Sequence, residues 1–164
     1  PLIFFQADGK KPGSEITLKA GGASIEVRAE VRSYVPVHRL DVVLNGQVVS
    51  SREESSGTKT LTLNDKIQVP GPGWLAARCA SRLDLTGSLR IAAHTSPVYL
   101  RVPDQDLFSP SAAAYMLTLI EGAETWVKNL ATRPEPEQLA RISRVFTEAR
   151  DRLHHRMHQH GVKH

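Results

Sequence analysis

The residues best suited to chemistry occur in two places in this 164-residue chain. The first is AAHTSPVYL (92–100), where His94, Thr95 and Ser96 supply an imidazole and two hydroxyls before Pro97. A histidine that acts as a base can activate a neighbouring hydroxyl as the nucleophile of a hydrolase. Adjacent strand residues point to opposite faces, and no acidic residue lies close in sequence to orient His94. We therefore interpret the segment as the last strand of a β-domain, bent at Pro97, which lacks an N–H and suits an edge or a bulge.

The second place is the C-terminal segment HHRMHQHGVKH, which holds five of the seven histidines. His154 and His158 are four residues apart, so on a helix they share a face and could bind a divalent metal ion. No cysteine follows them, and Asp151 lies on another part of the turn. Two histidines make a weak site, so we expect a solvated helix end without a cofactor and keep His154 and His158 as candidate metal ligands.

The composition is that of a globular domain with a core: 40% hydrophobic and 23% charged residues. The net charge of +4 is dispersed, with no basic run longer than Lys10-Lys11, so we expect no nucleic-acid partner. A single cysteine, Cys79, excludes an intrachain disulfide, and no apolar run is long enough to span a membrane. The chain opens directly on a strand-like PLIFF segment without a signal peptide, so we expect it to be part of a longer protein.

The composition changes near residue 109. Before it, segments such as ASIEVRAEVRS (23–33) alternate between apolar and polar residues, as half-buried strands do. Asn45-Gly46 has the signature of a tight hairpin turn, and SREESSGT (51–58) is interpreted as a loop. Seven to nine short strands, with turn signals about every 8–12 residues, predict an immunoglobulin-like antiparallel β-sandwich over residues 1–108.

Residues 109–164 predict a helical hairpin. Ser109 is the candidate N-cap of its first helix, with Pro110 at the first helical position. The apolar stripe predicted for the first helix comprises Met116, Leu119/Ile120, Ala123, Val127 and Leu130. The stripe predicted for the second comprises Leu139, Ile142, Phe146, Ala149, Leu153 and Met157. The hairpin must bury these stripes on each other, on the sandwich or on a partner.

Two tryptophans are candidate interface residues. Aromatic residues make up only 5% of the chain, too few for a carbohydrate-binding face lined with rings. Trp74 follows a GPG turn and is expected in the core or at the rim of the sandwich, and Trp126 borders the first helical stripe. Together with His94 they are our candidate contacts with a neighbouring domain, whereas Cys79 is expected to be an inert core residue.

Three segments carry a resemblance to a known family: RAEVRSYVPVHRLDVVLNGQVV (28–49), GPGWLAARC (71–79) and AAHTSPVYLRV (92–102). In this order and spacing the chain resembles the C-terminal region of bacterial PHP-type metallohydrolases of the CehA/McbA-like branch. The resemblance covers residues 1–103 and, more loosely, the helices. It implies a β-sandwich that follows a metal-dependent hydrolase domain. The His-x-His, Asp and Glu metal ligands of that family belong to the upstream domain, so the resemblance implies no catalytic residue and no cofactor in this chain.

The predicted function is therefore non-catalytic. We expect an accessory domain that supports or orients the upstream hydrolase domain of the same chain, and a homodimer of this chain is one way in which it could do so. A divalent metal is implied only for the missing catalytic domain, and the resemblance is compatible with export. Three alternatives stay open, since fold alone does not specify function. They are a carbohydrate- or surface-binding sandwich module, a small hydrolase or metal-binding protein that uses His94 or the C-terminal histidines, and a protein–protein adaptor that binds through its helices.

Overall fold

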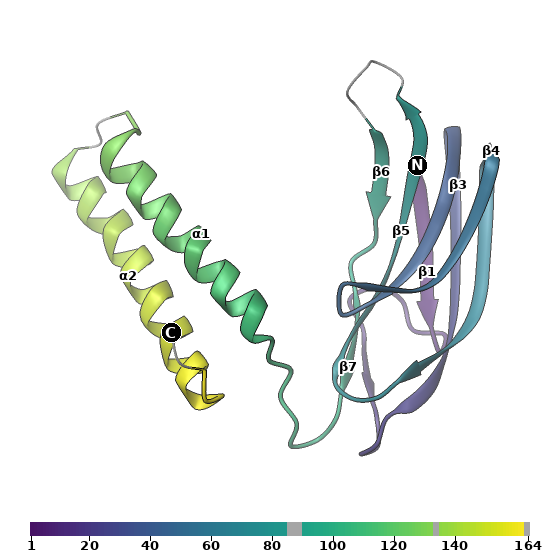
Figure 1. Cartoon of the computed structure of the whole chain (residues 1–164), viewed down its shortest axis with the longest axis horizontal. Helices are drawn as coiled ribbons and strands as arrows, with labels where there is room; N and C mark the ends of the chain where they lie inside the picture. The colour runs from purple at the N-terminus through teal and green to yellow at the C-terminus, as the bar shows by residue number, and fades with distance from the viewer. Residues whose placement is uncertain (85–89, 133–134, 163–164) are drawn as a thin grey trace. The chain divides into compact units, whose positions relative to one another are not determined.

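The computed structural model describes residues 1–84, 90–132 and 135–162 of the chain (Figure 1). The chain divides into two compact units, Pro1–Leu107 and Phe108–His164. The first unit contains the strands and the second contains two helices.

The first unit is a mainly antiparallel system in which every described strand except β2 pairs with β3 or β5 or is one of these two strands, and β2 pairs with β7. The strands are β1 (Leu2–Ala7), β2 (Glu15–Thr17), β3 (Ala23–Leu44), β4 (Gln47–Val69), β5 (Gly73–Asp84), β6 (Arg90–His94) and β7 (Val98–Arg101). β3 pairs with β1, β4 and β5, and β5 also pairs with β6 and β7. Of the described pairings only that of β2 with β7 is parallel.

The hairpin of β3 and β4 contributes to both layers of the sandwich. The first half of β3 pairs with β1 and with the end of β4, while its second half pairs with β5 and with the start of β4. The register shifts between Arg32 and Val37, where the strand bends. Because of this shift, the inward-facing residues change from Val27 and Val31 to Leu40 and Val42, and both halves of β3 face one core.

The loop predicted for residues 51–58 is wrong, because these residues lie within β4. β4 has a free edge among the described strands, and a polar, charged sequence is what an exposed edge strand requires. Gly57 of β4 allows β3 and β4 to stay close at the bend. Its φ is +74°, which favours glycine, and a Cβ there would clash because it would lie 2.9 Å from side-chain atoms of Pro36 and His38.

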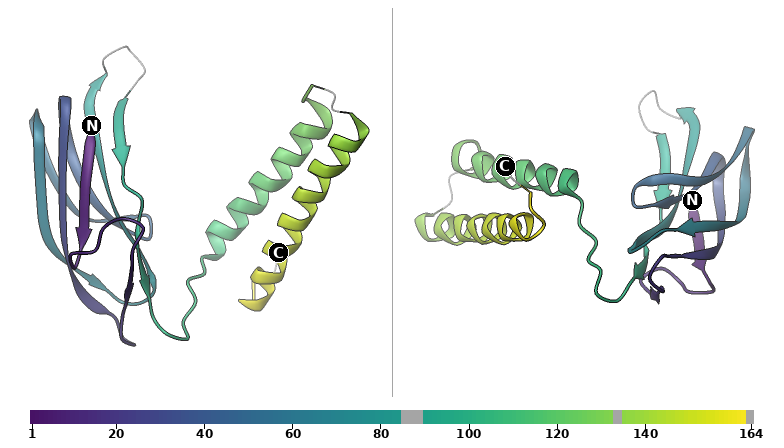
Figure 2. Two further views of the ribbon diagram at one scale, coloured as in Figure 1. Left: turned by 180° about the vertical axis from the view of Figure 1, so that it is seen from behind. Right: turned by 60° about the horizontal axis from the view of Figure 1, so that its bottom comes forward.

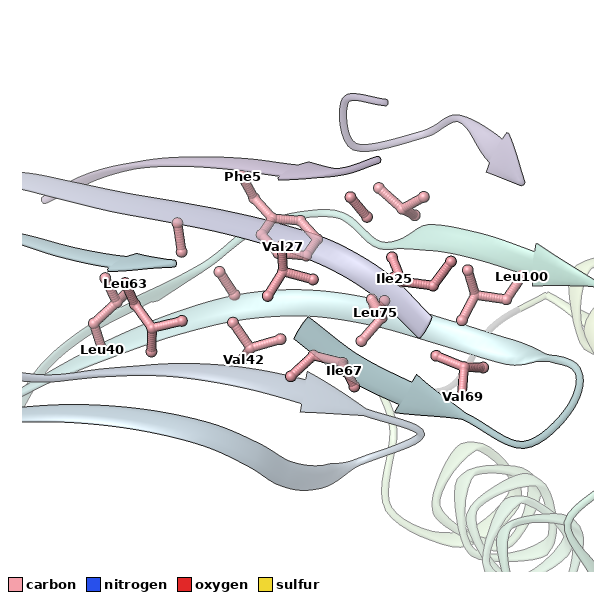
Figure 3. Packing of buried hydrophobic residues seen from close by; sticks show 14 of the residues in the cluster. Phe5, Ile25, Val27, Leu40, Val42, Leu63, Ile67, Val69, Leu75 and Leu100 are labelled. Atoms are coloured by element: carbon pink, nitrogen blue, oxygen red, sulfur yellow. The ribbon is translucent and has the colours of Figure 1, made fainter. Parts of the chain in front are cut away.

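The core forms where the two layers face each other, as Figure 3 shows. Phe5, Ile25 and Ile67 meet Val42 and Leu75 there, all buried. Burying a side chain of this size contributes about 1.5–3 kcal/mol. The predicted immunoglobulin-like sandwich followed by two helices is confirmed by this arrangement.

Two local predictions in the strand region have clear outcomes. The Asn45-Gly46 turn is confirmed, with φ values of 50° and 87°. The segment AAHTSPVYL is not one bent strand but two short ones, because β6 ends at His94 and β7 begins at Val98. Both pair with β5, so the break around Pro97 divides the partners of a single strand.

The second unit is an antiparallel pair of helices, α1 (Pro110–Asn129) and α2 (Pro136–Gln159), which pack against each other (Figure 2). The predicted cap is confirmed: Ser109 Oγ accepts a hydrogen bond from the Ala112 N–H at 3.3 Å. At the open end, the rings of Phe108 and His160 stack with centroids 4.2 Å apart. No helix among the described residues is long and apolar enough to cross a membrane.

The stripe predicted for α1 is only partly right, because Ile120 and Val127 lie on the packed face and its other members are exposed. The face that packs on α2 contains Leu117, Ile120 and Glu124, whereas Met116 and Leu130 are exposed. Two adjacent faces of α1 are apolar, and only the position of α2 selects between them. The stripe predicted for α2 matches better, with Met157 fully buried and only its member Ile142 exposed.

Candidate binding site on the β-sandwich

The outer face of the sheet around β5 carries a row of polar residues from four strands. Asp41 of β3 pairs in register with Ser51 of β4 and with Arg78 of β5, and Arg78 pairs with His94 of β6. Residues directly opposed across a sheet share a face, so the four side chains form one row. Arg78 therefore separates His94 from the carboxylate of Asp41.

Asp41 anchors this row although its surface is only 3% exposed. Its Oδ1 accepts hydrogen bonds from Arg39 Nε at 2.6 Å and Ser51 Oγ at 2.7 Å, and its Oδ2 accepts one from Arg78 Nε at 3.1 Å. Burial alone would raise the pKa of Asp41, but the bonds from Arg39, Ser51 and Arg78 outweigh it and hold the pKa below its usual value. The carboxylate is thus kept ionised and fixes the guanidinium of Arg78.

Next to this row lies an open hollow of about 640 Å³. Its aromatic wall is a cross-strand pair, Trp74 of β5 opposite Tyr99 of β7. Tyr99 is 45% exposed and Trp74 is half-buried. The remaining lining residues are Val43, Gly46, Ala76, Ala77, Arg78, His94, Thr95, Ser96 and Pro97. The hollow is therefore mostly apolar, with an imidazole and a guanidinium at its rim.

Backbone hydrogen bonds hold the aromatic wall in place. The Trp74 N–H donates to Asn45 Oδ1 at 2.9 Å, so the hairpin turn of β3 and β4 supports the hollow. Gly73 leaves room for this contact, because a Cβ there would lie 2.5 Å from the Asn45 amide oxygen. The Asn45-Gly46 turn, which the sequence predicts, thus also positions Trp74.

His94, Thr95 and Ser96 all line the hollow, but Thr95 is engaged with the backbone. Its hydroxyl accepts the Ala77 N–H at 3.1 Å, and its own N–H donates to the Ala77 carbonyl at 2.9 Å. The Nδ1 of His94 lies 3.2 Å from the Thr95 carbonyl oxygen, so the imidazole is oriented by the main chain. This arrangement continues the pairing with β5 beyond the end of β6.

A second histidine lies beside a hydroxyl in the interior, where sequence analysis did not identify it. His38 Nδ1 and Ser81 Oγ are 3.5 Å apart, and both residues are buried. Because both side chains are buried, a substrate has no access to them. We interpret the pair as two polar core groups that satisfy each other's hydrogen-bonding capacity.

The candidate metal ligands lie in the other unit. His154 is half-buried and His158 is exposed, one turn apart on α2. Within the described parts of the chain, no three His, Cys, Asp or Glu side chains form a group that could hold a metal ion. Trp126, the third candidate interface residue, is 56% exposed on α1.

Of the predicted interface residues, the structure brings Trp74 and His94 together in one hollow and places Trp126 on α1. Sequence analysis missed Tyr99, Arg78 and Asp41. The alternation of β5 puts Trp74 and Arg78 on one face, which was a usable signal. Tyr99 joins them only through the pairing of β5 with β7.

No family model matches the chain, and no curated protein matches it. Among solved structures it is similar to the fibronectin(III)-like modules of Clostridium thermocellum CbhA, with 21% identity and a TM-score of 0.36 over 59% of this chain and 94% of that chain. It is also similar to a Jonesia denitrificans lytic polysaccharide monooxygenase, with 14% identity and a TM-score of 0.31 over 56% of this chain and 58% of that chain.

The strand pairing itself defines the class of this protein. Its first unit is an immunoglobulin-like β-sandwich in which one long hairpin contributes to both layers, and an α-helical hairpin follows.

Proposed function

We propose that this chain is a non-catalytic accessory module whose sandwich docks onto a partner domain through the hollow around Trp74. The observation that carries this proposal is the aromatic pair of Trp74 and Tyr99, left open to solvent on a regular sheet beside Arg78. Tryptophan, tyrosine and arginine are the residues that most often dominate binding energy at protein interfaces. A patch with this composition is best explained as a contact surface.

Hydrogen bonds also hold the residues that line the hollow, which favours binding over mere exposure. Asp41 holds Arg78, Asn45 holds the backbone of Trp74, and Ala77 holds Thr95. A surface that is already ordered loses little conformational entropy when a partner binds. The same hydrogen bonds engage Thr95 in the sheet, which supports a binding role for the segment.

The partner we propose is a PHP-type metal-dependent hydrolase domain of the same protein, on the basis of the sequence resemblance. In this arrangement the hydrolase domain holds the divalent metal ion and performs the reaction. The sandwich contributes a docking surface and no metal ligand. The proposal concerns support and orientation, so it places no residue of this chain among reacting atoms.

Hydroxyl-radical footprinting of the complete gene product and of the 164-residue chain tests the docking. We expect the side chains of Trp74 and Tyr99 to be labelled several-fold less in the complete product. Tyr34, which is 92% exposed on β3 and far from the hollow in sequence, is the internal control and should be labelled equally in both. Equal labelling of Trp74 in both proteins would refute the docking. A complete gene product without a metal-dependent hydrolase domain would refute the proposed partner.

A second candidate function is carbohydrate binding, favoured by the adjacent rings of Trp74 and Tyr99. Small-ligand sites are concave and mostly apolar, with a few polar groups that orient the ligand. In a Trp126→Phe background, Trp74 is the only tryptophan and reports on the hollow directly. Titration with soluble cello-, xylo- and chito-oligosaccharides should then shift its fluorescence, and Tyr99→Ala should abolish the shift. An unchanged spectrum at millimolar sugar would exclude this function for the sugars tested.

A further inference from the structure

The two helices meet along a coiled-coil-like seam. On α1 the seam residues follow a spacing of four and three: Ala113, Leu117, Ile120, Glu124 and Val127. On α2 the same spacing gives Leu139, Ser143, Phe146, Arg150, Leu153 and Met157. All of these residues are buried or half-buried, as expected for knobs that insert between the turns of a facing helix.

This seam is a weak core for two helices alone. Its centre holds a charged group: Glu124 bonds to Lys128 at 2.7 Å and to Arg150 at 3.2 Å. Among the described apolar residues of the hairpin, only Ala113 and Met157 are buried. Units of this size bury too little apolar surface for stability unless another element covers them.

A second apolar stripe runs along α1 beside the seam. It consists of the residues that precede each seam position, Ala112, Met116, Leu119, Ala123 and Trp126, together with Leu130 at the C-cap. The exposed fractions of Met116, Leu119, Trp126 and Leu130 are 48%, 45%, 56% and 75%. On α2 the corresponding positions hold Ile142, Val145 and Ala149 in the middle of the helix and Gln138, Arg152 and Arg156 toward its ends. In an antiparallel pair the residues that precede the seam lie on the same side of both helices, so the two sets form one face.

The size of this face is that of an interface. The exposed fractions of its large side chains correspond to on the order of 600 Å² of accessible surface. A standard protein interface buries about 800 Å² on each partner. Covering the face on both partners would bury about 1,200 Å² in total, the lower end of the range of specific interfaces.

We propose that a second copy of this chain covers the face, so that two hairpins form a four-helix bundle. The spacing of the α1 stripe is close to symmetric about Ala123: Met116 and Leu130 lie seven residues on either side, whereas Leu119 lies four residues before it and Trp126 three residues after it. When two copies of α1 pack antiparallel with Ala123 at the two-fold axis, Met116 faces Leu130 of the other copy. A two-fold contact requires a self-matching surface, and the stripe meets this requirement.

The charges on α2 fit the same arrangement. Glu124 bonds to Arg150, so Ala149 lies at about the level of Ala123. The two-fold axis then brings two copies of α2 together near Ala149. Arg152 of one copy comes within two residues, or about 3 Å along the helix, of the level of Glu148 of the other. The proposed interface therefore gains this pair of opposite charges, formed twice by the two-fold axis.

Sedimentation equilibrium of the 164-residue chain, from about 1 to 100 µM, tests this proposal. We expect a dimer, and Trp126→Glu should weaken it at least tenfold because a charge would enter the interface. Tyr115→Glu is the matched control: Tyr115 is an exposed aromatic residue of the same helix outside the stripe, so this variant should dimerise normally. Both changes are at exposed positions, and circular dichroism checks that the helices remain.

A charge reversal tests the geometry separately. Arg152→Glu should weaken the dimer, and Glu148→Lys combined with Arg152→Glu should restore it. A monomer throughout the concentration range would overturn the proposal, as would a dimer that Trp126→Glu leaves intact. A double variant no tighter than Arg152→Glu would overturn the two-fold arrangement. None of these outcomes depends on the hollow around Trp74, so the docking proposed above is tested independently.

Discussion

Replacing Asp41 by asparagine tests the central electrostatic feature of the sandwich. The side chains have nearly the same shape, so packing in β3 should be preserved. An asparagine can still accept hydrogen bonds from Arg39 and Ser51 through Oδ1. Its Nδ2, however, would face Arg78 Nε where Asp41 now offers Oδ2 at 3.1 Å, and two donors would oppose each other.

The size of the effect follows from these contacts. A hydrogen bond to a charged group contributes about 1.5–3 kcal/mol, and one such bond is lost outright. Arg39 and Arg78 have side chains that are 41% and 51% exposed, so water can solvate them once the carboxylate is gone. This places the expected loss in the lower part of that range, at about 2 kcal/mol of unfolding free energy at pH 7.

The loss should depend on pH in a defined direction. The pKa of Asp41 is lower in the folded chain than its ordinary value, so ionised Asp41 stabilises the fold above that ordinary value. This contribution disappears as pH falls through the folded pKa. The difference between wild type and Asp41→Asn should therefore be equal at pH 7 and pH 5 and shrink as the pH falls below about 4.

Urea unfolding followed by tryptophan fluorescence measures the difference, with Trp126→Phe as the background so that Trp74 reports on the sandwich. Asp104→Asn is the control, since Asp104 is an exposed residue with a φ of 59° that asparagine also tolerates. A difference below about 0.5 kcal/mol at pH 7, or one that stays constant down to pH 3, would refute the assigned role of Asp41.

Three further predictions concern other parts of the chain. Gly22→Ala should destabilise the sandwich by more than about 2 kcal/mol in urea, because its φ is +89° and a Cβ would lie 2.0 Å from the Val69 carbonyl oxygen; Gly71→Ala, whose Cβ meets nothing closer than 3.9 Å, should be nearly neutral. Ser109→Ala should cost the helical hairpin about 1 kcal/mol in thermal unfolding, and Ser109→Asp should not, since aspartate also caps a helix. Burial raises the pKa of the Cys79 thiol, so a thiol reagent should label it only after denaturant is added; rapid labelling of the native chain would contradict the burial.

Local features of the fold were readable from the sequence. Alternation predicted the first half of β3, Asn45-Gly46 predicted the hairpin turn, and Ser109 predicted the start of α1. Each of these depends on backbone preferences and side chains within a few residues. Such signals keep their meaning whatever the rest of the chain does.

The errors share a physical cause, which is pairing between distant segments. Residues 51–58 are polar enough for a loop, yet they belong to β4 because β3 continues opposite them through the bend. The segment 92–100 looked continuous, but β5 pairs with its two halves separately. Neither outcome can be read from the segment itself, since the partner strand decides it.

The candidate site shows the same division. From the sequence, Trp74 and His94 were separate candidates on two strands, and Tyr99 was not considered. Only the register of β5 with β6 and β7 brings these three residues to one hollow. Only the pairing of β3 with β5 brings Asp41 to Arg78.

By itself, the sequence determined the two helices and most of the strand segments, because hydrophobic periodicity and turn residues act locally. Tertiary structure decided which faces meet: on α1 two adjacent stripes are apolar, and the packing of α2 selects the one that contains Glu124. The stripe with Trp126 is left exposed for this reason. Both stripes are largely apolar and have the same spacing, so only the docking of another element could distinguish the buried face from the free one.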